Sequence, residues 1–265
     1  MNTRSKTLTR LVATGVSLFA LSSVAMAAPA VGLVGDKTLV WFDTDAPEVS
    51  NTVDVEGVDS LVGIDVRPGD RKLYGVAGDG TIVTIDLETG AATAGGKLTE
   101  MLPDGVAGMV DFNPVADAIR VMGTDGTNLR IKPDTGETTV DGSLNFEAGD
   151  ANADATPNVV ATAYINSIGK PEATAMYDID AGLGALLRQT APNDGTLATI
   201  GELGIEGAEA YAFDIQATAE GENTAWLAAA GALYTVDLET GAATKVADIT
   251  GVDGDLRDIA ILPAM

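Results

Sequence analysis

Short apolar or alternating runs follow one another along most of the chain and are separated by turn residues, the pattern of consecutive β-hairpins. One full unit has runs at residues 61–66, 72–76, 81–85 and 91–98, with Asp79-Gly80 and Thr89-Gly90 among the turns. A second unit repeats this order at 106–112, 118–122, 128–131 and 137–140, and two more span 159–200 and 210–249. Residues 31–55 supply three further strands and residues 256–262 supply one. The pattern therefore predicts five four-stranded units, the fifth assembled from both ends of the chain.

Two internal repeats indicate how these units are arranged. TIDLETGAAT at 84–93 returns as TVDLETGAAT at 235–244. A second element reads apolar, Asp, apolar, polar, and its second positions lie 46, 53, 50 and 44 residues apart. The interval from the last copy through the C-terminus to residue 28 and on to the first copy is 45 residues, which matches the others. A ring explains this match, whereas an open solenoid does not. The second positions are Asp65, Asp111, Tyr164, Asp214 and Asp258.

We therefore predict an all-β fold, a five-bladed β-propeller whose C-terminal strand 256–262 pairs with the strand near 31–34 and closes the N-terminal blade. The inner strands are expected near residues 61, 107, 160, 210 and 257. A β-sandwich is the alternative, but it does not explain the wrap-around interval.

The first 27 residues have the features of a signal peptide. A basic start with Arg4, Lys6 and Arg10 precedes an apolar run at 11–24 and the small-x-small site at 25–27. That apolar run is shorter than the roughly 20 residues that span a membrane. We expect residues 28–265 to form one propeller domain of an exported protein, either periplasmic or extracellular.

Composition limits the chemistry and the partners. The chain has no cysteine and no histidine, so it lacks a thiol nucleophile, disulfides and the commonest general base. Of its 15 basic residues three lie within the first 27, where none of the 39 acidic residues lies, so residues 28–265 carry a formal charge of −27. Such a surface repels nucleic acid and anionic membranes. It attracts cations or basic partners, or serves only as a solvation layer.

The repeated second positions form the first candidate site. Equivalent places on the inner strands would put Asp65, Asp111, Tyr164, Asp214 and Asp258 at one height around the axis. Carboxylates brought together share protons, bind a cation or pair with basic groups. The alternative, which we favour, is that each aspartate accepts backbone amide hydrogen bonds from the neighbouring blade. The candidate arginine partners are Arg67, Arg120, Arg130 and Arg257.

A second, weaker candidate is a calcium loop at Asp150, Asn152 and Asp154, whose oxygens lie on alternate residues. The glycine and glutamate of a complete calcium loop are replaced by Ala155 and Ala161, so an ordinary polar loop is the alternative. No other cofactor is expected.

Several motifs resemble one known family. They are GIDVRP at 63–68, DFNP at 111–114, IRV at 119–121, NLRIKPDTG at 128–136, the AYINS segment from Ala163 and LRDIAI at 256–261. This combination is similar to a family of secreted bacterial proteins catalogued as domain of unknown function 4394. The resemblance covers nearly all of residues 28–265 and implies a propeller-type fold, but it supplies no established activity or substrate.

The chain lacks a recognisable nucleophile motif, which favours a non-enzymatic binding or scaffold protein, expected to be a monomer, for a small molecule, a glycan or a protein. One alternative is a glycosidase-like carbohydrate-active enzyme that uses two of the channel carboxylates of Asp65, Asp111, Asp214 and Asp258. Another is a surface or matrix protein that binds divalent cations through its acidic face.

Overall fold

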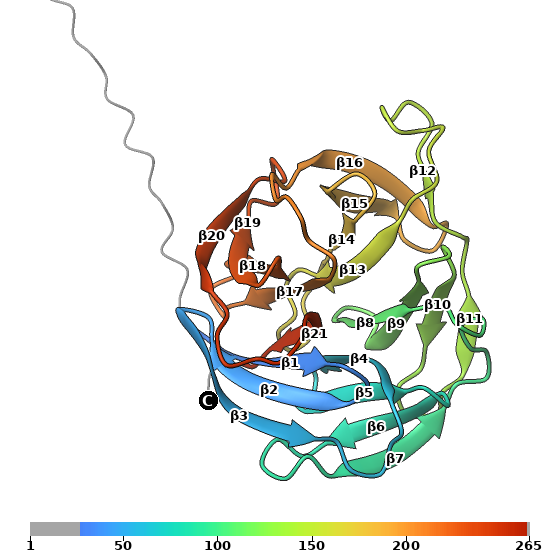
Figure 1. The fold of residues 1–265 in the computed structure, drawn as a ribbon. Coiled ribbons are helices and arrows are strands. Elements are labelled where there is room, and N and C mark those ends of the chain that lie inside the picture. The colour runs from blue at the N-terminus through green and yellow to red at the C-terminus, as the bar shows by residue number, and fades with distance from the viewer. Residues whose placement is uncertain (1–26, 264–265) are drawn as a thin grey trace, which may run out of the picture.

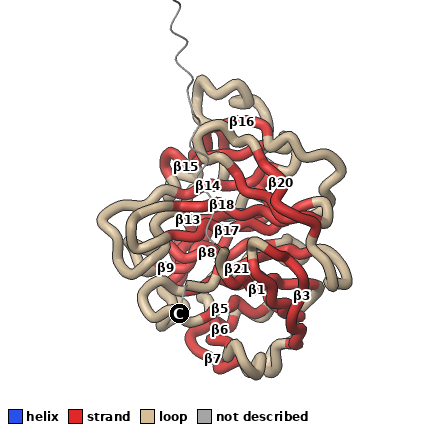
Figure 2. Tube along the Cα trace, turned by 90° about the vertical axis from the view of Figure 1, so that its left-hand side faces the viewer, coloured by secondary structure: helices blue, strands red, loops and turns tan. Residues whose placement is uncertain are grey.

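The computed structural model describes residues 27–263, so the predicted signal peptide lies almost wholly outside the described residues. The described chain forms five sheets arranged around a central axis, as a five-bladed β-propeller (Figure 1). A view turned by 90° shows strands joined by loops (Figure 2). Between residues 27 and 263 no helix is long and apolar enough to cross a membrane.

Blade 1 contains both ends of the described chain. It consists of β1 (Pro29–Val34), β2 (Thr38–Asp43), β3 (Ala46–Asp54) and β21 (Leu256–Ile261), in the order β21-β1-β2-β3. The strands β1 and β21 are antiparallel, with Ala30 opposite Ile261 and Leu33 opposite Asp258. The predicted closure is therefore confirmed, and β21 is the innermost strand of its blade.

The other blades follow the chain in order, each from its inner to its outer strand. Their inner strands begin at residues 61, 108, 159 and 211, within one residue of the predicted positions. Blade 2 is β4 (Leu61–Val66), β5 (Leu73–Ala77), β6 (Thr81–Ile85) and β7 (Ala92–Lys97). Blade 3 is β8 (Gly108–Asn113), β9 (Ala118–Gly123), β10 (Asn128–Ile131) and β11 (Thr138–Val140). Blade 4 is β13 (Val159–Tyr164), β14 (Met176–Asp180), β15 (Ala185–Ala191) and β16 (Thr196–Glu202). Blade 5 is β17 (Tyr211–Ala217), β18 (Asn223–Ala229), β19 (Ala232–Val236) and β20 (Ala243–Asp248).

Blade 4 has a fifth strand that the sequence pattern did not predict. The two residues of β12 (Asn145–Phe146) pair in parallel with the outer strand β16. Phe146 is buried in the apolar cluster between blades 3 and 4. The short strand therefore carries an anchor that attaches the connection between these blades to the outside of blade 4.

Five apolar clusters, one at each interface between neighbouring blades, form the core. Strand residues of both sheets contribute to each cluster because successive side chains point to opposite faces of a strand. Between blades 2 and 3, for example, the rings of Tyr74 and Phe112 meet edge to face with centroids 5.3 Å apart. Trp226 is buried between blades 5 and 1 and donates its indole N–H to Gln216 Oε1.

The repeated TG motifs form tight turns. Asp86 Oδ1 accepts the backbone amide of Thr89 at 2.8 Å, and Gly90 follows with a φ of 74°. In the second copy Asp237 binds the amide of Thr240 in the same way. A positive φ favours glycine because it has no Cβ. Asp134 precedes a third Thr-Gly pair in the sequence. Its carboxylate lies 3.0 Å from the guanidinium of Arg67 in blade 2.

Candidate functional site

Four aspartates of the inner strands lie buried near the axis. One carboxylate oxygen from each of Asp65 on β4, Asp111 on β8 and Asp214 on β17 lies within 4.8 Å of the other two. Asp258 on β21 interacts electrostatically with all three. The four residues are 3 to 7% exposed. The repeat therefore brings four carboxylates into one poorly hydrated space.

Each of these aspartates accepts a hydrogen bond from a backbone amide of the next blade. Each donor amide lies in the inner strand of the blade that follows the aspartate, so the bonds run around the ring in one direction. Buried amides require such acceptors. The bonds are Ile64 N to Asp258 Oδ2 at 2.8 Å, Phe112 N to Asp65 Oδ2 at 2.7 Å, Tyr164 N to Asp111 Oδ1 at 3.2 Å and Ile261 N to Asp214 Oδ2 at 2.6 Å.

Three of the carboxylates use their other oxygen as well. Asp65, Asp214 and Asp258 each accept the amide of the following residue in their own strand, at 2.6 to 3.0 Å. Asp111 has no such second bond among the described residues. Through these hydrogen bonds the aspartates join neighbouring blades, which is the interpretation that we favoured from the sequence.

Tyr164 does not join the carboxylates. Its ring belongs to the apolar cluster between blades 3 and 4, and its hydroxyl accepts a long hydrogen bond of 3.4 Å from Arg120 Nε. At this position of the expected ring the side chain therefore packs in the interface between blades 3 and 4. The junction between blades 4 and 5 instead has a pair of asparagines, in which Asn223 Oδ1 accepts Asn166 N and Asn223 Nδ2 donates to Asn166 Oδ1.

Burial raises the pKa values of the axial carboxyl groups because the charged form loses its hydration. The pKa of Asp214 rises to about 6 and that of Asp258 to about 8, with loss of hydration as the largest cause in each. The pKa values of Asp65 and Asp111 are also raised, first by burial and then by the charge of another axial aspartate. The cluster therefore holds protons near neutral pH despite the amide hydrogen bonds.

None of the four candidate arginines forms an ion pair with an axial aspartate among the described residues, although Arg120 donates to the hydroxyl of Tyr164. Arg67 forms ion pairs with Asp117 at 2.6 Å and with Asp134. Arg120 on β9 and Arg130 on β10 both bind Asp141, at 2.6 and 3.0 Å. These two strands are the second and third of their blade and lie farther from the axis than β8.

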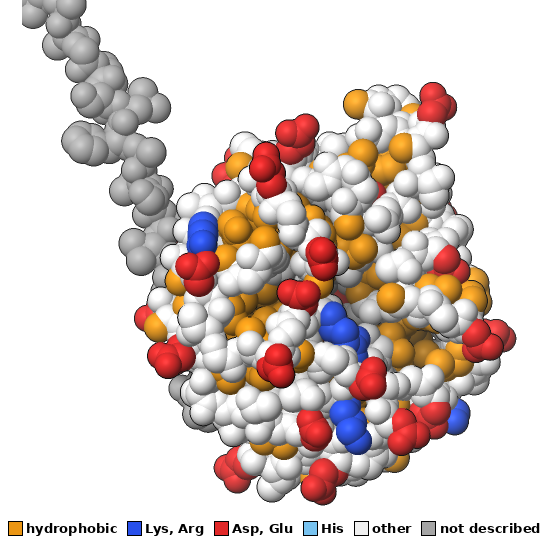
Figure 3. Space-filling model, in the orientation of Figure 1, with side chains coloured by type: hydrophobic (Ala, Val, Ile, Leu, Met, Phe, Trp, Pro, Cys, Tyr) orange, Lys and Arg blue, Asp and Glu red, His pale blue; other side chains and the backbone are white. Residues whose placement is uncertain are grey.

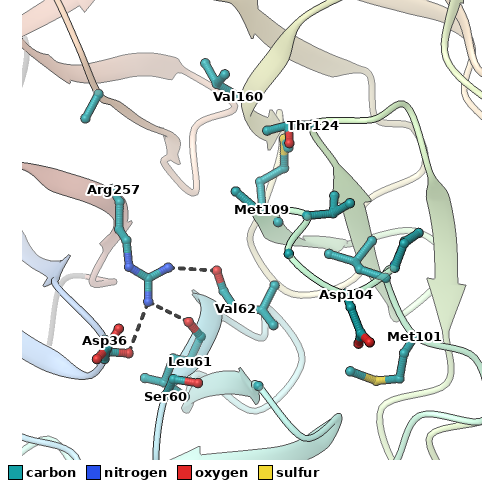
Figure 4. Close-up of a pocket in the computed structure, with 18 of the residues that line it drawn as sticks. Asp36, Ser60, Leu61, Val62, Met101, Asp104, Met109, Thr124, Val160 and Arg257 are labelled. Atoms are coloured by element: carbon teal, nitrogen blue, oxygen red, sulfur yellow. Dashed lines mark hydrogen bonds between the residues drawn. The ribbon is translucent and has the colours of Figure 1, made fainter.

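Arg257 precedes Asp258 on β21, so its side chain points to the other face of the strand. Its guanidinium donates to the backbone carbonyls of Gly35, Asp36, Leu61 and Val62, which belong to blades 1 and 2 or the segments next to their strands. Figure 4 shows the bonds to Asp36, Leu61 and Val62. Arg257 therefore fastens the terminal strand to both blades. Its guanidinium forms no ion pair with an axial carboxylate among the described residues, although its positive charge acts to lower the pKa of Asp258.

A depression of about 680 Å³ opens where the inner strands begin. All five blades or the loops before them contribute, with Leu61, Gly108, Val160, Tyr211 and Arg257 each at or near the start of an inner strand. Figure 4 shows Met101 and Asp104 on the loop before β8, across the depression from Arg257. The four axial aspartates do not line it.

Sequence reasoning did not identify this depression. Met101, Asp36, Asp104 and Glu209 line it, and all four are exposed. They lie in loops between blades or between β1 and β2, where no repeat marks them. The available signal was the exposed Met101 in the loop at 99–107, since large apolar side chains on a polar loop favour a binding surface.

The proposed calcium loop is attached to blade 4. Asp150 accepts hydrogen bonds from Asn152 N, Thr199 N and Thr199 Oγ1, at 2.6 to 2.9 Å. Burial opposes ionisation of Asp150, but these hydrogen bonds outweigh it and lower its pKa. Asp154 is exposed. The geometry shows an anchored polar loop, and calcium binding by Asp150, Asn152 and Asp154 stays a prediction.

Blade 4 also contains a buried acid that the sequence pattern did not mark. Asp178 Oδ1 accepts the hydroxyl of Thr162 at 2.7 Å, whereas Asp178 Oδ2 and Gln189 Oε1 are buried and have no hydrogen-bond partner within residues 27–263. Burial is the main cause that raises the pKa of Asp178 to about 7. This carboxyl group lies inside the blade and does not line the depression.

Comparisons with known proteins support the fold. A family model described as "Domain of unknown function (DUF4394)" matches residues 38–260. A solved structure of a protein of unknown function from Bacteroides thetaiotaomicron is similar with a TM-score of 0.54 and 15% sequence identity. That similarity covers 91% of this chain and 66% of the other, so this chain spans just under two thirds of its length.

Two further solved structures have lower scores. A protein of unknown function from Bacteroides caccae has a TM-score of 0.43 and 13% identity, over 86% of this chain and 77% of its own. An auxiliary nutrient binding protein from Bacteroides thetaiotaomicron has a TM-score of 0.46 and 12% identity, over 81% of this chain and 58% of its own. The search of curated proteins found no match.

Proposed function

This chain belongs to the DUF4394 family, and we propose that it is an exported, non-enzymatic binding protein whose ligand occupies the axial depression. The observation that carries the proposal is the depression itself, to which all five blades contribute. Its volume of about 680 Å³ falls within the range of roughly 300–1,000 Å³ typical of ligand sites. Apolar side chains and a few polar groups line it together, which is the usual composition of such sites.

The placement of the carboxylates favours binding over hydrolysis. A glycosidase needs two carboxyl groups on either side of the scissile bond. Asp65, Asp111, Asp214 and Asp258 are buried outside the lining of the depression and hold the blades together through amide hydrogen bonds. They are therefore not presented to a sugar bound in the depression.

Export is the second part of the proposal. A basic start, an apolar run and a small-x-small site precede residue 28. The absence of cysteine from the sequence removes any dependence on the redox state of the compartment. Cell fractionation with an antibody against residues 28–265 would test export. A protein found in the cytosol with its N-terminus intact would contradict it.

A second candidate function is binding of a divalent cation on the axis. The oxygens of Asp65, Asp111 and Asp214 favour it by lying within 4.8 Å of one another. Against it, Asp65 and Asp214 already use both oxygens to accept amides. A calcium-dependent rise in melting temperature that Asp111→Asn abolishes would support this candidate.

The depression can be tested by filling it. Ala107 lines it and has an exposed side chain, so Ala107→Trp would reduce its volume without disturbing the core. Val140→Trp on the outer strand β11 is the matched control, since Val140 is 63% exposed and outside the lining. We expect ligands found by a thermal-shift screen of small molecules and glycans to lose binding to Ala107→Trp and keep binding to Val140→Trp. Ligands that bind both variants equally would contradict the proposed site.

A further inference from the structure

A second hollow, of about 760 Å³, adjoins the depression. The two share Ser60, Gly78 and Asp79 in their linings. The second hollow continues along the boundary between blades 1 and 2, from Lys37 to Ala92 and Ala94 at β7. Together they form a groove that leads from the axis toward the outer edge of blade 2, which we call the radial groove. Its shape suits an elongated ligand.

The acidic groups of the radial groove have free acceptor atoms. Asp36, Asp59, Asp104 and Glu209 line it and are exposed, and their carboxylates form no hydrogen bond or ion pair with another described residue. Asp79 is paired with Lys97 at 3.0 Å, but both side chains are 62% exposed, so that pair is weak. The groove therefore presents unused hydrogen-bond acceptors with negative charge.

The basic groups of the radial groove donate to the protein's own backbone. Lys37 Nζ donates to the carbonyl of Val58 at 2.9 Å, and Arg257 donates to four backbone carbonyls. The lining holds five acidic and two basic residues, so its formal charge is −3. With most donors used and acceptors free, the groove is complementary to a ligand that carries hydrogen-bond donors and positive charge.

Apolar side chains lie between these charges. Val62, Met101, Met109 and Val160 line the depression, and Figure 4 shows Val62 and Met109 between Arg257 and Asp104. Such apolar side chains can pack against the methylene groups of a flexible organic cation. A hydrated metal ion or an uncharged sugar would not use this combination of apolar walls and free carboxylates.

Building on the proposed function, we propose that the radial groove binds a linear aliphatic polyamine, a chain of methylene groups with ammonium groups along it. The ammonium groups bind the carboxylates of Asp59, Asp104 and Glu209, and the methylene segments cover the apolar wall. The formal net charge of −24 concentrates such a cation near the protein, and the face shown in Figure 3 has more acidic than basic side chains.

The test must separate the groove from the general attraction of an acidic protein. The probe is spermine, titrated by calorimetry into the mature protein in 150 mM salt, which weakens diffuse surface attraction. The groove variant combines Asp59→Asn, Asp104→Asn and Glu209→Gln. The control combines Glu88→Gln, Glu172→Gln and Glu239→Gln, three exposed residues outside both linings, and removes the same charge.

We expect one spermine per chain, a Kd about tenfold weaker for the groove variant and less than a twofold change for the control. Butylamine, with one ammonium group, should bind far more weakly than spermine. Equal weakening in both variants, or no binding by the wild type at this salt concentration, would overturn the inference. The proposed function would survive that result if an uncharged ligand still bound in a manner blocked by Ala107→Trp.

Discussion

The stability of this protein should fall as the pH rises from 4 to 8, and the buried carboxyl groups should be the cause. Histidine is absent, so no imidazole titrates in this range. The pKa of Asp214 is raised from 3.8 to about 6 in the folded protein. Between these two values the folded state binds more protons than the unfolded state, and unfolding becomes easier as the pH rises. The contribution is fully present below pH 3.8 and is lost as the pH passes 6.

Asp214→Asn isolates this contribution. A difference of about two pKa units corresponds to roughly 3 kcal/mol. The variant should therefore gain about 3 kcal/mol relative to the wild type between pH 4 and pH 7. A constant loss of about 1–3 kcal/mol is superimposed, because the asparagine can accept only one of the two amides that Asp214 binds, Ile215 N and Ile261 N.

Urea denaturation of both proteins at pH 4, 5, 6 and 7 measures the effect. Asp194→Asn is the control, because it removes one exposed carboxylate in the turn before β16. A wild-type stability that rises over this range would refute the reasoning. So would an Asp214→Asn variant that keeps the wild-type dependence on pH.

Three further predictions concern the connections between blades. Deletion of residues 256–265 removes β21 and exposes the apolar edge of β1, so gel filtration should show aggregation and the melting temperature should drop sharply. Arg257→Met keeps an unbranched apolar stem but removes the guanidinium that donates to four carbonyls, and urea denaturation should show a loss of about 1–3 kcal/mol. Asp150→Ala frees the amide of Thr199, so hydrogen exchange should become faster in residues 150–154 and stay unchanged in blade 2. Each prediction is contradicted by one result. These results are a truncated protein that stays monomeric and heat-stable, an Arg257→Met variant with the stability of the wild type, and unchanged hydrogen exchange in residues 150–154 of Asp150→Ala.

The architecture was predictable because a closed ring requires the repeat interval to continue across the two ends of the chain, and that interval can be counted in the sequence. The interval across the chain ends falls within the range of the others, as expected if the last strand completes the first blade, and β21 does pair with β1. The aspartates were predictable in kind, because the repeat places them on inner strands where amides of the next blade need acceptors.

The details of the site were less predictable. The register between neighbouring blades varies, since Asp65 binds the amide one residue after Asp111, whereas Asp214 binds the amide three residues after Asp258. The destination of an arginine depends on which strand of the blade carries it, which a motif match does not fix. The depression is formed by loops of unequal length and composition, and the periodicity of the strands contains no information about them.

The asparagine pair between blades 4 and 5 makes this joint chemically different from the other four. Asn166 and Asn223 are neutral, so the hydrogen bonds between them keep their strength as the pH changes. At the other four joints the acceptor is a carboxyl group whose protonation alters both its hydrogen bonds and its repulsion of its neighbours. The pH therefore determines which interfaces between blades open first. At alkaline pH the four carboxyl groups lose their protons and repel one another, so these four interfaces should open before the one with the asparagine pair.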